Sequence, residues 1–326
     1  MRMRSHKIKN LVFSVLIIIL GLVVIYSGFR LISPVVSNKD VEASTKNIER
    51  DGKKYFPRQD ITVFLIMGID REGAVQDSGF SRNNGDADVV VLAVFDENEK
   101  TYDLVCLNRD TMVEMPVLDI RGKSAGTEIH QLALSHTYGS GLSDSCENTK
   151  KTVSEFLYGL EIDYYLSMNM DTVGILNDAV GGVTVNVTDD FSAADPTITK
   201  GEIKLNAEQA LNFVRTRKDL GDQMNTSRMK RHEEFMRGFF QAFGEKIKES
   251  DTFALSLYED ISDYSVSNFT ANTLVSLANR YSEYTLDEIV SPEGENVVGK
   301  EYMEFYADEE KLDELVIRMF YQEKKK

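Results

Sequence analysis

Residues 204–239 read KLNAEQALNFVRTRKDLGDQMNTSRMKRHEEFMRGF. The whole chain carries a formal net charge of −16, yet this stretch concentrates Arg215, Arg217, Arg228, Lys230 and Arg231 within seventeen residues. Planar guanidinium groups suit phosphate, which they bind through two parallel hydrogen bonds. The stretch therefore indicates an anion-binding site. The alternative is a solvated basic helix face, or arginines paired with the surplus carboxylates.

The second half of this stretch predicts a helix from residue 226 to about residue 248. Arg228, Arg231 and His232 stand at positions i, i+3 and i+4 of this helix, so they share one face. Like charges at this spacing destabilise an isolated helix by about 0.2–0.5 kcal/mol per pair. An anion bound against the face would offset that repulsion.

Three apolar runs upstream of this stretch predict consecutive β-strands: Ile61–Ile69, Val89–Phe95 and Tyr102–Leu107. If they form a meander, one edge of the sheet carries Asp70, Asp88, Arg109 and Asp110. Two carboxylates that converge at strand ends suit Mg²⁺, which prefers oxygen ligands. Each aspartate taken alone is more typical of a turn or cap residue than of a cation ligand, but all three strands expose charge at the same end, which favours the joint site.

Helical and strand patterns alternate from residue 146 to residue 248. This alternation predicts a three-layer α/β/α domain with a mixed central sheet over residues 60–245. Residues 246–326 are acidic and their pattern predicts a helical extension that packs on or follows the domain.

The N-terminal segment predicts a membrane anchor. Four cationic residues precede an uncharged apolar run of nineteen residues, Leu11–Phe29. About 20 apolar residues span a bilayer as a helix, and flanking cations stay on the cytoplasmic side. We therefore expect a cytoplasmic segment (residues 1–10), a transmembrane helix (residues 11–32) and an extracellular linker (residues 33–59). A cleaved signal peptide is the alternative, but its apolar region is usually only about 7–15 residues long.

Charge and cysteine usage limit the possible partners. A sequence pI near 4.8 argues against nucleic acid, because neutralising its phosphates needs a basic face. Cys106 and Cys146 are the only cysteines, and both lie in the part predicted to be outside the cell. They either form a disulfide or remain separate thiols, with Cys106 a buried strand residue.

Several ordered motifs together resemble the LytR–CpsA–Psr family of cell-wall glycopolymer ligases, over about residues 60–245. They are Phe64–Arg71, Asp88–Leu92, Leu107–Thr111, Tyr138-Gly139, Ile162–Tyr165, Asp178–Val183, Leu205–Leu211, Arg215-Thr-Arg217 and Arg228–His232. The short basic N-terminus and the single anchor also fit this family. Two positions depart from its usual pattern. Asp86 stands where a basic residue is common, and His232 stands where glutamine is usual.

The resemblance implies a set of site residues. Asp70 and Asp88 would hold a divalent cation, Mg²⁺ or Mn²⁺. The pyrophosphate of a polyprenyl-linked glycan would be bound by the arginines of the motifs and by the basic helix face, namely Arg109, Arg215, Arg217, Arg228, Arg231 and His232. Its apolar tail would lie between the sheet and the helices. Arg109 and Asp110 would act in catalysis, with Asp110 a base by position; pairing of Asp110 with an arginine is the alternative.

The function expected from this resemblance is phosphoryl transfer outside the cell membrane. A glycopolymer such as teichoic acid or capsule would move from a polyprenyl pyrophosphate carrier to a peptidoglycan acceptor. Three alternatives stay open: a hydrolase of the same lipid pyrophosphate, a non-catalytic lipid- or glycan-binding module, and a membrane-bound regulator of transcription. The last requires the large domain to be cytoplasmic, which the cationic N-terminus argues against.

Overall fold

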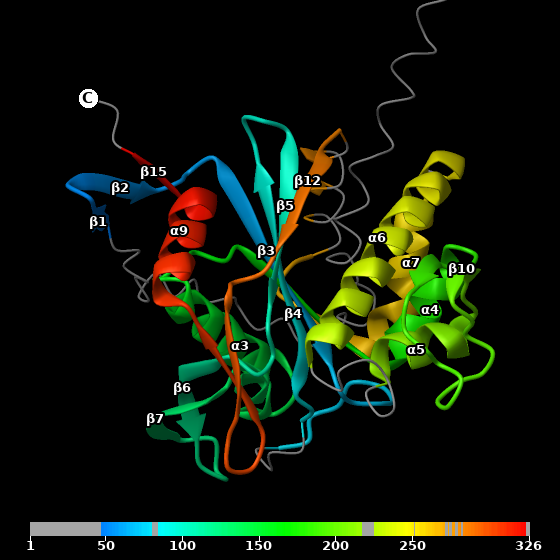
Figure 1. The fold of residues 1–326 in the computed structure, drawn as a ribbon, viewed down its shortest axis with the longest axis horizontal. Coiled ribbons are helices and arrows are strands. Elements are labelled where there is room, and N and C mark those ends of the chain that lie inside the picture. Colours follow the sequence, from blue (N-terminus) through cyan, green and yellow to red (C-terminus); the bar gives the residue numbers. More distant parts are fainter. Residues whose placement is uncertain are drawn as a thin grey trace, which may run out of the picture.

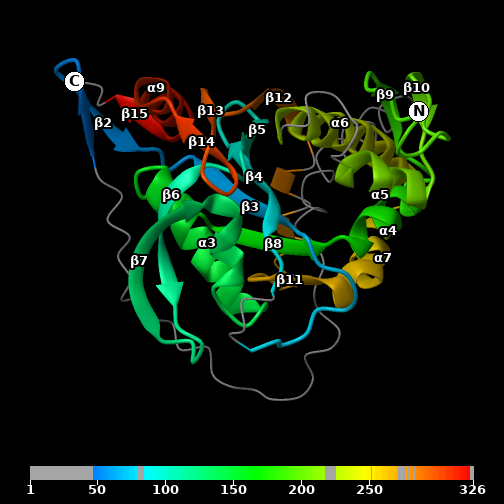
Figure 2. The same ribbon diagram turned by 60° about the horizontal axis from the view of Figure 1, so that its bottom comes forward.

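Three long apolar strands form the centre of the fold, joined as the antiparallel meander that the sequence predicted. Their neighbours make the sheet mixed, because β8 runs parallel to β3, β12 runs parallel to β5, and β11 runs antiparallel to β8. The order across the sheet is β11-β8-β3-β4-β5-β12. Figure 1 labels β3, β4, β5 and β12, and Figure 2 also labels β8 and β11. The six strands are β3 (Ile61–Ile69), β4 (Ala87–Asp96), β5 (Thr101–Leu107), β8 (Tyr164–Asn169), β11 (Ser265–Ser267) and β12 (Thr285–Val290).

The computed structural model describes residues 47–323, apart from residues 80–83, 217–224, 251, 271, 272, 274, 275, 278, 279 and 282. The predicted cytoplasmic segment (residues 1–10) and transmembrane helix (residues 11–32) lie outside the described residues, as does most of the predicted linker. Within the described part of the chain, no helix combines the length and the apolar character that crossing a membrane requires.

Helices cover both faces of the sheet, since successive strand side chains point to opposite faces and both sets are apolar. Phe64 and Ile66 belong to one buried cluster, whereas Leu65 and Met67 belong to the other. Figure 2 shows the two groups of helices on opposite sides of the sheet. On the first face lie α4 (Asp171–Ala179), α5 (Ala207–Arg215), α6 (Asn225–Glu249) and α7 (Phe253–Ile261); on the second lie α3 (Ser143–Phe156) and α9 (Glu309–Phe320).

Short strands form four smaller sheets around this centre. They pair β1 (Ile48–Arg50) with β2 (Lys53–Pro57) and β15 (Tyr321–Glu323), β6 (Met112–Leu118) with β7 (Ser124–Gln131), β9 (Thr184–Val187) with β10 (Gly201–Lys204), and β13 (Gly294–Val298) with β14 (Met303–Ala307). Two 3₁₀ turns, η2 (Leu132–Thr137) and η3 (Ser262–Tyr264), complete the described elements.

The C-terminal segment differs from its prediction. Residues 246–326 contain α7 and α9, but they also supply β11 and β12 to the central sheet and three further strands. The prediction of a helical extension is wrong for these strands. Strand β12 covers the edge of β5, whose backbone groups would otherwise be unpaired. Strand β15 pairs with β2, which lies in the predicted linker, so the two ends of the described chain share one sheet.

The two cysteines lie on opposite faces of the central sheet. Cys106 belongs to the cluster under α4 to α7, and Cys146 belongs to the cluster under α3 and α9. Both are buried free thiols. Of the two possibilities that the sequence left open, the structure has the separate thiols.

Candidate active site

The meander brings three chain segments to one edge of the sheet. Strand β3 ends at Ile69, which pairs with Ala87 at the start of β4, and Val90 pairs with Leu107 at the end of β5. The amide of Asp70 donates to the carbonyl of Asp86 at 2.9 Å, which ties the first two segments together beyond the ladder. The carboxylates that follow β3 and open β4 therefore lie at the same edge of the sheet as the arginine that follows β5.

A buried ion network forms at this edge. Arg109 contacts Asp88, and its Nη2 atom lies 3.0 Å from Asp86 Oδ2. Asp88 Oδ2 also lies 2.6 Å from Nη1 of Arg228, which comes from α6. The Arg109, Arg228 and Asp88 side chains are only 9%, 3% and 13% exposed, respectively. Buried charges need partners, because an unpaired ion in the interior is strongly destabilising.

Arg215 extends this network towards solvent. It closes α5, a helix that begins with a reciprocal cap between Asn206 and Gln209. Its Nη1 atom lies 2.6 Å from Glu72 Oε1, and its Nη2 atom lies 3.8 Å from Asp70 Oδ1. The Arg215 side chain is 49% exposed, so it can turn towards a ligand at low cost.

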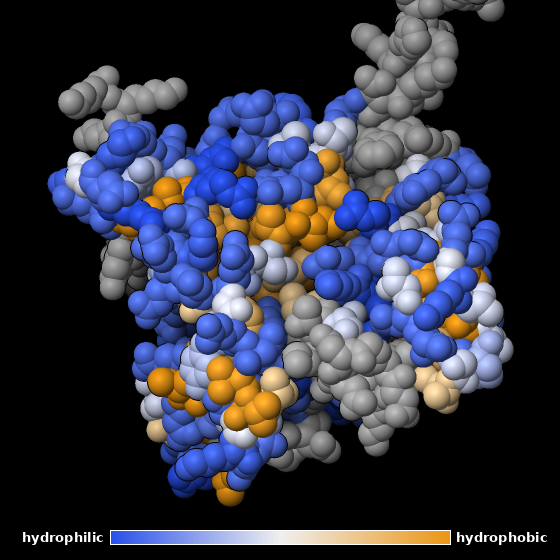
Figure 3. Space-filling view, in the orientation of Figure 1, coloured by the Kyte–Doolittle hydropathy of each residue, from blue (hydrophilic) through white to orange (hydrophobic). Residues whose placement is uncertain are grey.

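An apolar cavity of about 120 Å³ opens beside these charges, between the sheet and helices α4, α5 and α6. Figure 3 shows apolar surface between the central sheet and α6. Six polar side chains lie in the same lining: Asp88, Asn169, Thr172, Arg215, Arg228 and His232. The apolar part of the lining includes Ile66, Val89, Met168, Leu176, Phe235, Met236 and Phe239. The site therefore joins a cationic part to an apolar slot, as a lipid-linked phosphate requires.

Arg231 and His232 hold the carboxyl end of α5. Arg231 donates through Nε to the carbonyl of Phe213 at 2.9 Å, contacts the carbonyl of Thr216, and lies 2.6 Å from Asp189. His232 donates through Nε2 to the carbonyl of Val214 at 2.9 Å. These bonds satisfy carbonyls that a helix end leaves without intrahelical partners. Of the two residues, only His232 also lines the cavity.

The remaining predicted residues divide between the described and the undescribed chain. Asp110 is buried, accepts a hydrogen bond from Gln131 at 2.9 Å, and lies 3.3 Å from Nε of Arg109. The pairing with an arginine that the sequence left as an alternative is therefore present. Arg217 lies outside the described residues.

Two aspartates at this edge could serve as ligands of a divalent cation. Asp70 and Asp88 offer hard carboxylate oxygens at the ends of adjacent strands, which fits Mg²⁺ or Mn²⁺ in kind. The described residues contain no group of three or more histidine, cysteine, aspartate or glutamate side chains that could hold a metal ion. Mg²⁺ usually takes one or two carboxylates and completes its octahedron with phosphate and water oxygens. The residues therefore fit a cation that arrives together with a phosphate ligand.

Sequence reasoning missed three acidic partners of the arginines: Glu72, Asp86 and Asp189. A signal existed for Asp86, because it replaces a residue that is commonly basic in the resembled family. In the structure its carboxylate pairs with Arg109. Glu72 and Asp189 carried no such signal, since an isolated surface carboxylate is common anywhere in an acidic chain.

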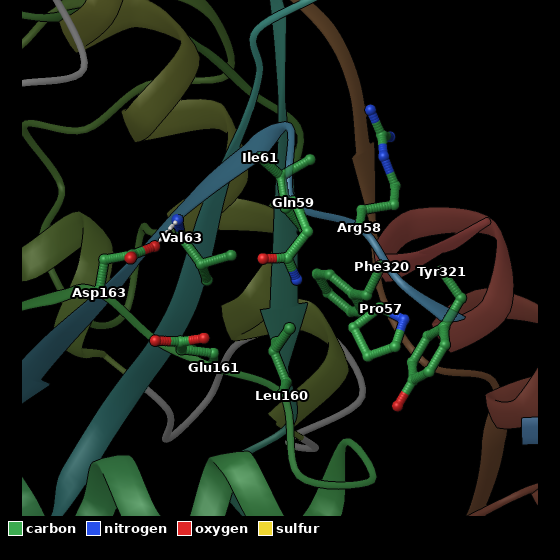
Figure 4. A pocket seen from close by; sticks show the side chains of 10 residues that line it. All are labelled: Pro57, Arg58, Gln59, Ile61, Val63, Leu160, Glu161, Asp163, Phe320 and Tyr321. Atoms are coloured by element: carbon green, nitrogen blue, oxygen red, sulfur yellow. Dashed lines mark hydrogen bonds between the residues drawn. The ribbon is translucent and has the colours of Figure 1, made fainter. Parts of the chain in front are cut away.

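A second cavity, of about 440 Å³, lies at the opposite end of β3, beside Ile61 and Val63. Figure 4 shows Glu161 and Asp163 on one side of it and Pro57, Phe320 and Tyr321 on the other. Asp163 accepts a hydrogen bond from the amide of Val63 at 2.8 Å. Because β3 spans roughly 26 Å at about 3.3 Å per residue, this cavity is separate from the arginine network.

The sequence of this chain is similar to a known protein family and to several of its members. The LytR_cpsA_psr family model matches residues 31–320. A polyisoprenyl-teichoic acid–peptidoglycan teichoic acid transferase TagU from Bacillus subtilis is 32% identical over 224 residues, which cover 66% of this chain and 65% of that relative. The TagU of Bacillus licheniformis is 26% identical over 98% of both chains. The chain thus spans slightly less than two thirds of the first relative and nearly all of the second.

The fold also has solved counterparts. A structure described as TagT bound to LI-WTA superimposes with a TM-score of 0.59 at 22% sequence identity, covering 84% of this chain and 95% of that chain. At this level of identity the likeness concerns the fold alone.

Proposed function

This chain belongs to the LytR–CpsA–Psr family, and from that premise we propose that it is a transferase that moves a glycopolymer from a polyprenyl pyrophosphate carrier to peptidoglycan. The curated relatives are named as teichoic acid transferases that act on a polyisoprenyl-linked polymer and peptidoglycan. We extend that donor and that acceptor to this chain. The proposal includes a membrane anchor at residues 11–32 and a catalytic domain outside the cell.

One observation supports the proposal above the others. Asp88 and Arg228 are 2.6 Å apart, and they share a cavity lining with Arg215 and with ten apolar side chains. A pyrophosphate needs cationic partners, and a prenyl tail needs a dry apolar surface. An apolar cavity of about 150 Å³ can hold benzene. A cavity of about 120 Å³ thus fits about one branched isoprene unit next to the phosphates.

The arginines perform the electrostatic part of the reaction. Arg109, Arg215 and Arg228 would neutralise charge on the two phosphates, and fixed donors of this kind stabilise developing charge without reorganisation. An acceptor hydroxyl attacks the phosphorus next to the sugar and loses its proton to solvent, the bond from this phosphorus to the bridging oxygen breaks, and prenyl phosphate leaves. Such transfers depend mainly on positioning and charge neutralisation. Mg²⁺ or Mn²⁺ held by Asp70 and Asp88 would supply further positive charge at the phosphates.

A product analysis tests this proposal. The full chain is incubated with a prenyl-pyrophosphoryl glycan and a peptidoglycan fragment, and prenyl phosphate and glycosylated fragment are measured. We expect both products in equal amounts, and a rate at least about 100-fold lower for Arg228→Ala. Release of prenyl phosphate without any transfer to the fragment would instead identify a hydrolase. Tight donor binding without turnover would identify a non-catalytic binding module.

A further inference from the structure

The C-terminal hairpin contacts the turn that carries Arg109. Strand β14 runs beside this turn, where the amide of Phe305 donates to the carbonyl of Asp110 at 2.8 Å. Thr111 and Phe305 also form an isolated parallel bridge. Phe305 is buried, so the contact lies within the packed interior. A segment almost 200 residues downstream in the sequence thereby fixes the backbone next to the arginine.

Gln131 connects the same turn to the hairpin through its side chain. Its Nε2 atom donates to Asp110 Oδ1 at 2.9 Å and to the carbonyl of Met303 at 2.7 Å. A glutamine amide has two N–H donors, so these two bonds use both. The Gln131 side chain is buried, where such bonds are costly to lose.

Asp110 passes this constraint to Arg109. The carboxylate oxygen that accepts from Gln131, Oδ1, lies 3.3 Å from Nε of Arg109. The backbone of Arg109 is held separately, because its carbonyl accepts from the amide of Ala133 at 3.0 Å. The Nε contact is an ion contact without hydrogen-bond geometry, so Asp110 acts on the guanidinium through charge and packing while the terminal nitrogens contact Asp86 and Asp88 at the site edge.

We propose that Gln131, together with β14, is a positioning element for Arg109, and that it acts through Asp110. The proposal rests on the proposed function, because it assumes that Arg109 binds the transferred phosphate. Gln131 contacts Asp110 rather than the cavity, so it is a positioning residue. The C-terminal hairpin lies outside the segment that carries the family motifs, and in this proposal it helps to position a residue of the site.

The test compares Gln131→Met in two backgrounds of the full chain. Methionine keeps the length and loses both N–H donors. With a prenyl-pyrophosphoryl N-acetylglucosamine donor and a peptidoglycan fragment, we expect Gln131→Met to lower kcat by about 10- to 100-fold, with a smaller change in KM. In an Arg109→Ala background, we expect the same substitution to change the rate by less than about twofold, since the group that it positions is already absent.

The outcomes separate this proposal from the proposed function. A wild-type rate for Gln131→Met, or an equal fractional loss in both backgrounds, overturns the positioning role. A wild-type rate for Arg109→Ala overturns the use of Arg109 in the proposed function itself. If the Arg109→Ala rate is too slow to measure, the affinity for geranylgeranyl pyrophosphate, measured by titration calorimetry, gives the same comparison. If Gln131→Met does not fold, Gln131→Asn, which retains the amide on a shorter stem, is expected to show the same loss.

Discussion

Nη1 of Arg228 lies 2.6 Å from Oδ2 of Asp88, although the two residues are 140 positions apart in the sequence. One comes from α6 and the other from the start of β4, and both line the apolar cavity. Because Arg109 contacts the same carboxylate, Asp88 holds two guanidinium groups at one place. Asp88 is therefore the shared counterion of arginines from two distant segments.

The first prediction concerns the stability of this assembly. Asp88→Asn keeps the shape of the side chain but leaves two buried cations without their shared partner, so we expect the free energy of unfolding to fall by about 3 kcal/mol. Urea unfolding followed by circular dichroism measures this change. The matched control is Asp86→Asn, because the Asp86 side chain is 33% exposed and pairs only with Arg109 among the contacts described. Its expected cost is below about 1 kcal/mol. Equal losses for the two variants would contradict the role of Asp88.

The second prediction concerns coupling between a divalent cation and phosphate. Asp88 is paired with arginines. A cation that binds Asp88 therefore frees these arginines for pyrophosphate, and pyrophosphate bound to the arginines frees Asp88 for the cation. The two ligands should bind together for this reason. We expect Mg²⁺ to raise the affinity for inorganic pyrophosphate about 10-fold in titration calorimetry, and Asp70→Asn to remove most of that increase. Glu72→Gln serves as the control, since Glu72 also pairs with Arg215 but is not a predicted cation ligand. Comparing variants cancels the binding of Mg²⁺ to pyrophosphate in solution. An unchanged increase in Asp70→Asn would exclude that residue as a ligand.

The sequence was sufficient for the centre of the sheet. Strands β3, β4 and β5 are apolar along nearly their whole length because both of their faces are buried, and short polar turns mark their ends. A meander of three such strands has one geometry at its edge, so the contact between Asp88 and Arg109 followed from topology, as did the place of Asp70 at the same edge. In contrast, β12 is a partly buried edge strand and β13 is exposed throughout, so neither has a continuous apolar pattern.

The same reasoning could not separate the individual arginines. Arg228 and Arg231 stand three residues apart on one helix face, yet Arg228 lines the cavity and Arg231 binds the carbonyls at the end of α5. A guanidinium that binds phosphate and one that caps a helix have identical sequence signatures. Only the position of α5 relative to α6, a tertiary feature, decides between them.

The third prediction tests the apolar slot. Met236→Trp should fill part of the cavity that Met236 lines. Fewer methylene groups of the prenyl tail can then be buried, so we expect the affinity for geranylgeranyl pyrophosphate to fall by about 10-fold or more. Binding of inorganic pyrophosphate, which has no tail, should remain within about twofold. Leu255→Trp is the control, because Leu255 is 41% exposed and does not line the cavity. A parallel loss of affinity for both ligands would show that the tail does not enter this slot.

The fourth prediction concerns pH and the loop that leads into β4. His136 lies beneath this loop, where it contacts the carbonyl of Gly85 at 3.2 Å through Nδ1, and it is almost fully buried. Burial lowers the pKa of His136 to about 4, against the hydrogen bonds and the nearby Asp144 and Asp86 carboxylates, which favour the charged form. The unfolded chain therefore binds more protons than the folded protein between about pH 6.5 and pH 4.

Stability should accordingly be lost as the pH falls through this window, by about 2 kcal/mol between pH 7 and pH 5 from this side chain alone. Urea unfolding at a series of pH values measures the slope, and His136→Gln, which cannot titrate but can still donate to the Gly85 carbonyl, should flatten it by that amount. If His136→Gln and the wild type lose stability in parallel, the acid sensitivity of the fold arises from other groups, since a histidine that is buried and neutral must gain a proton on unfolding in this range.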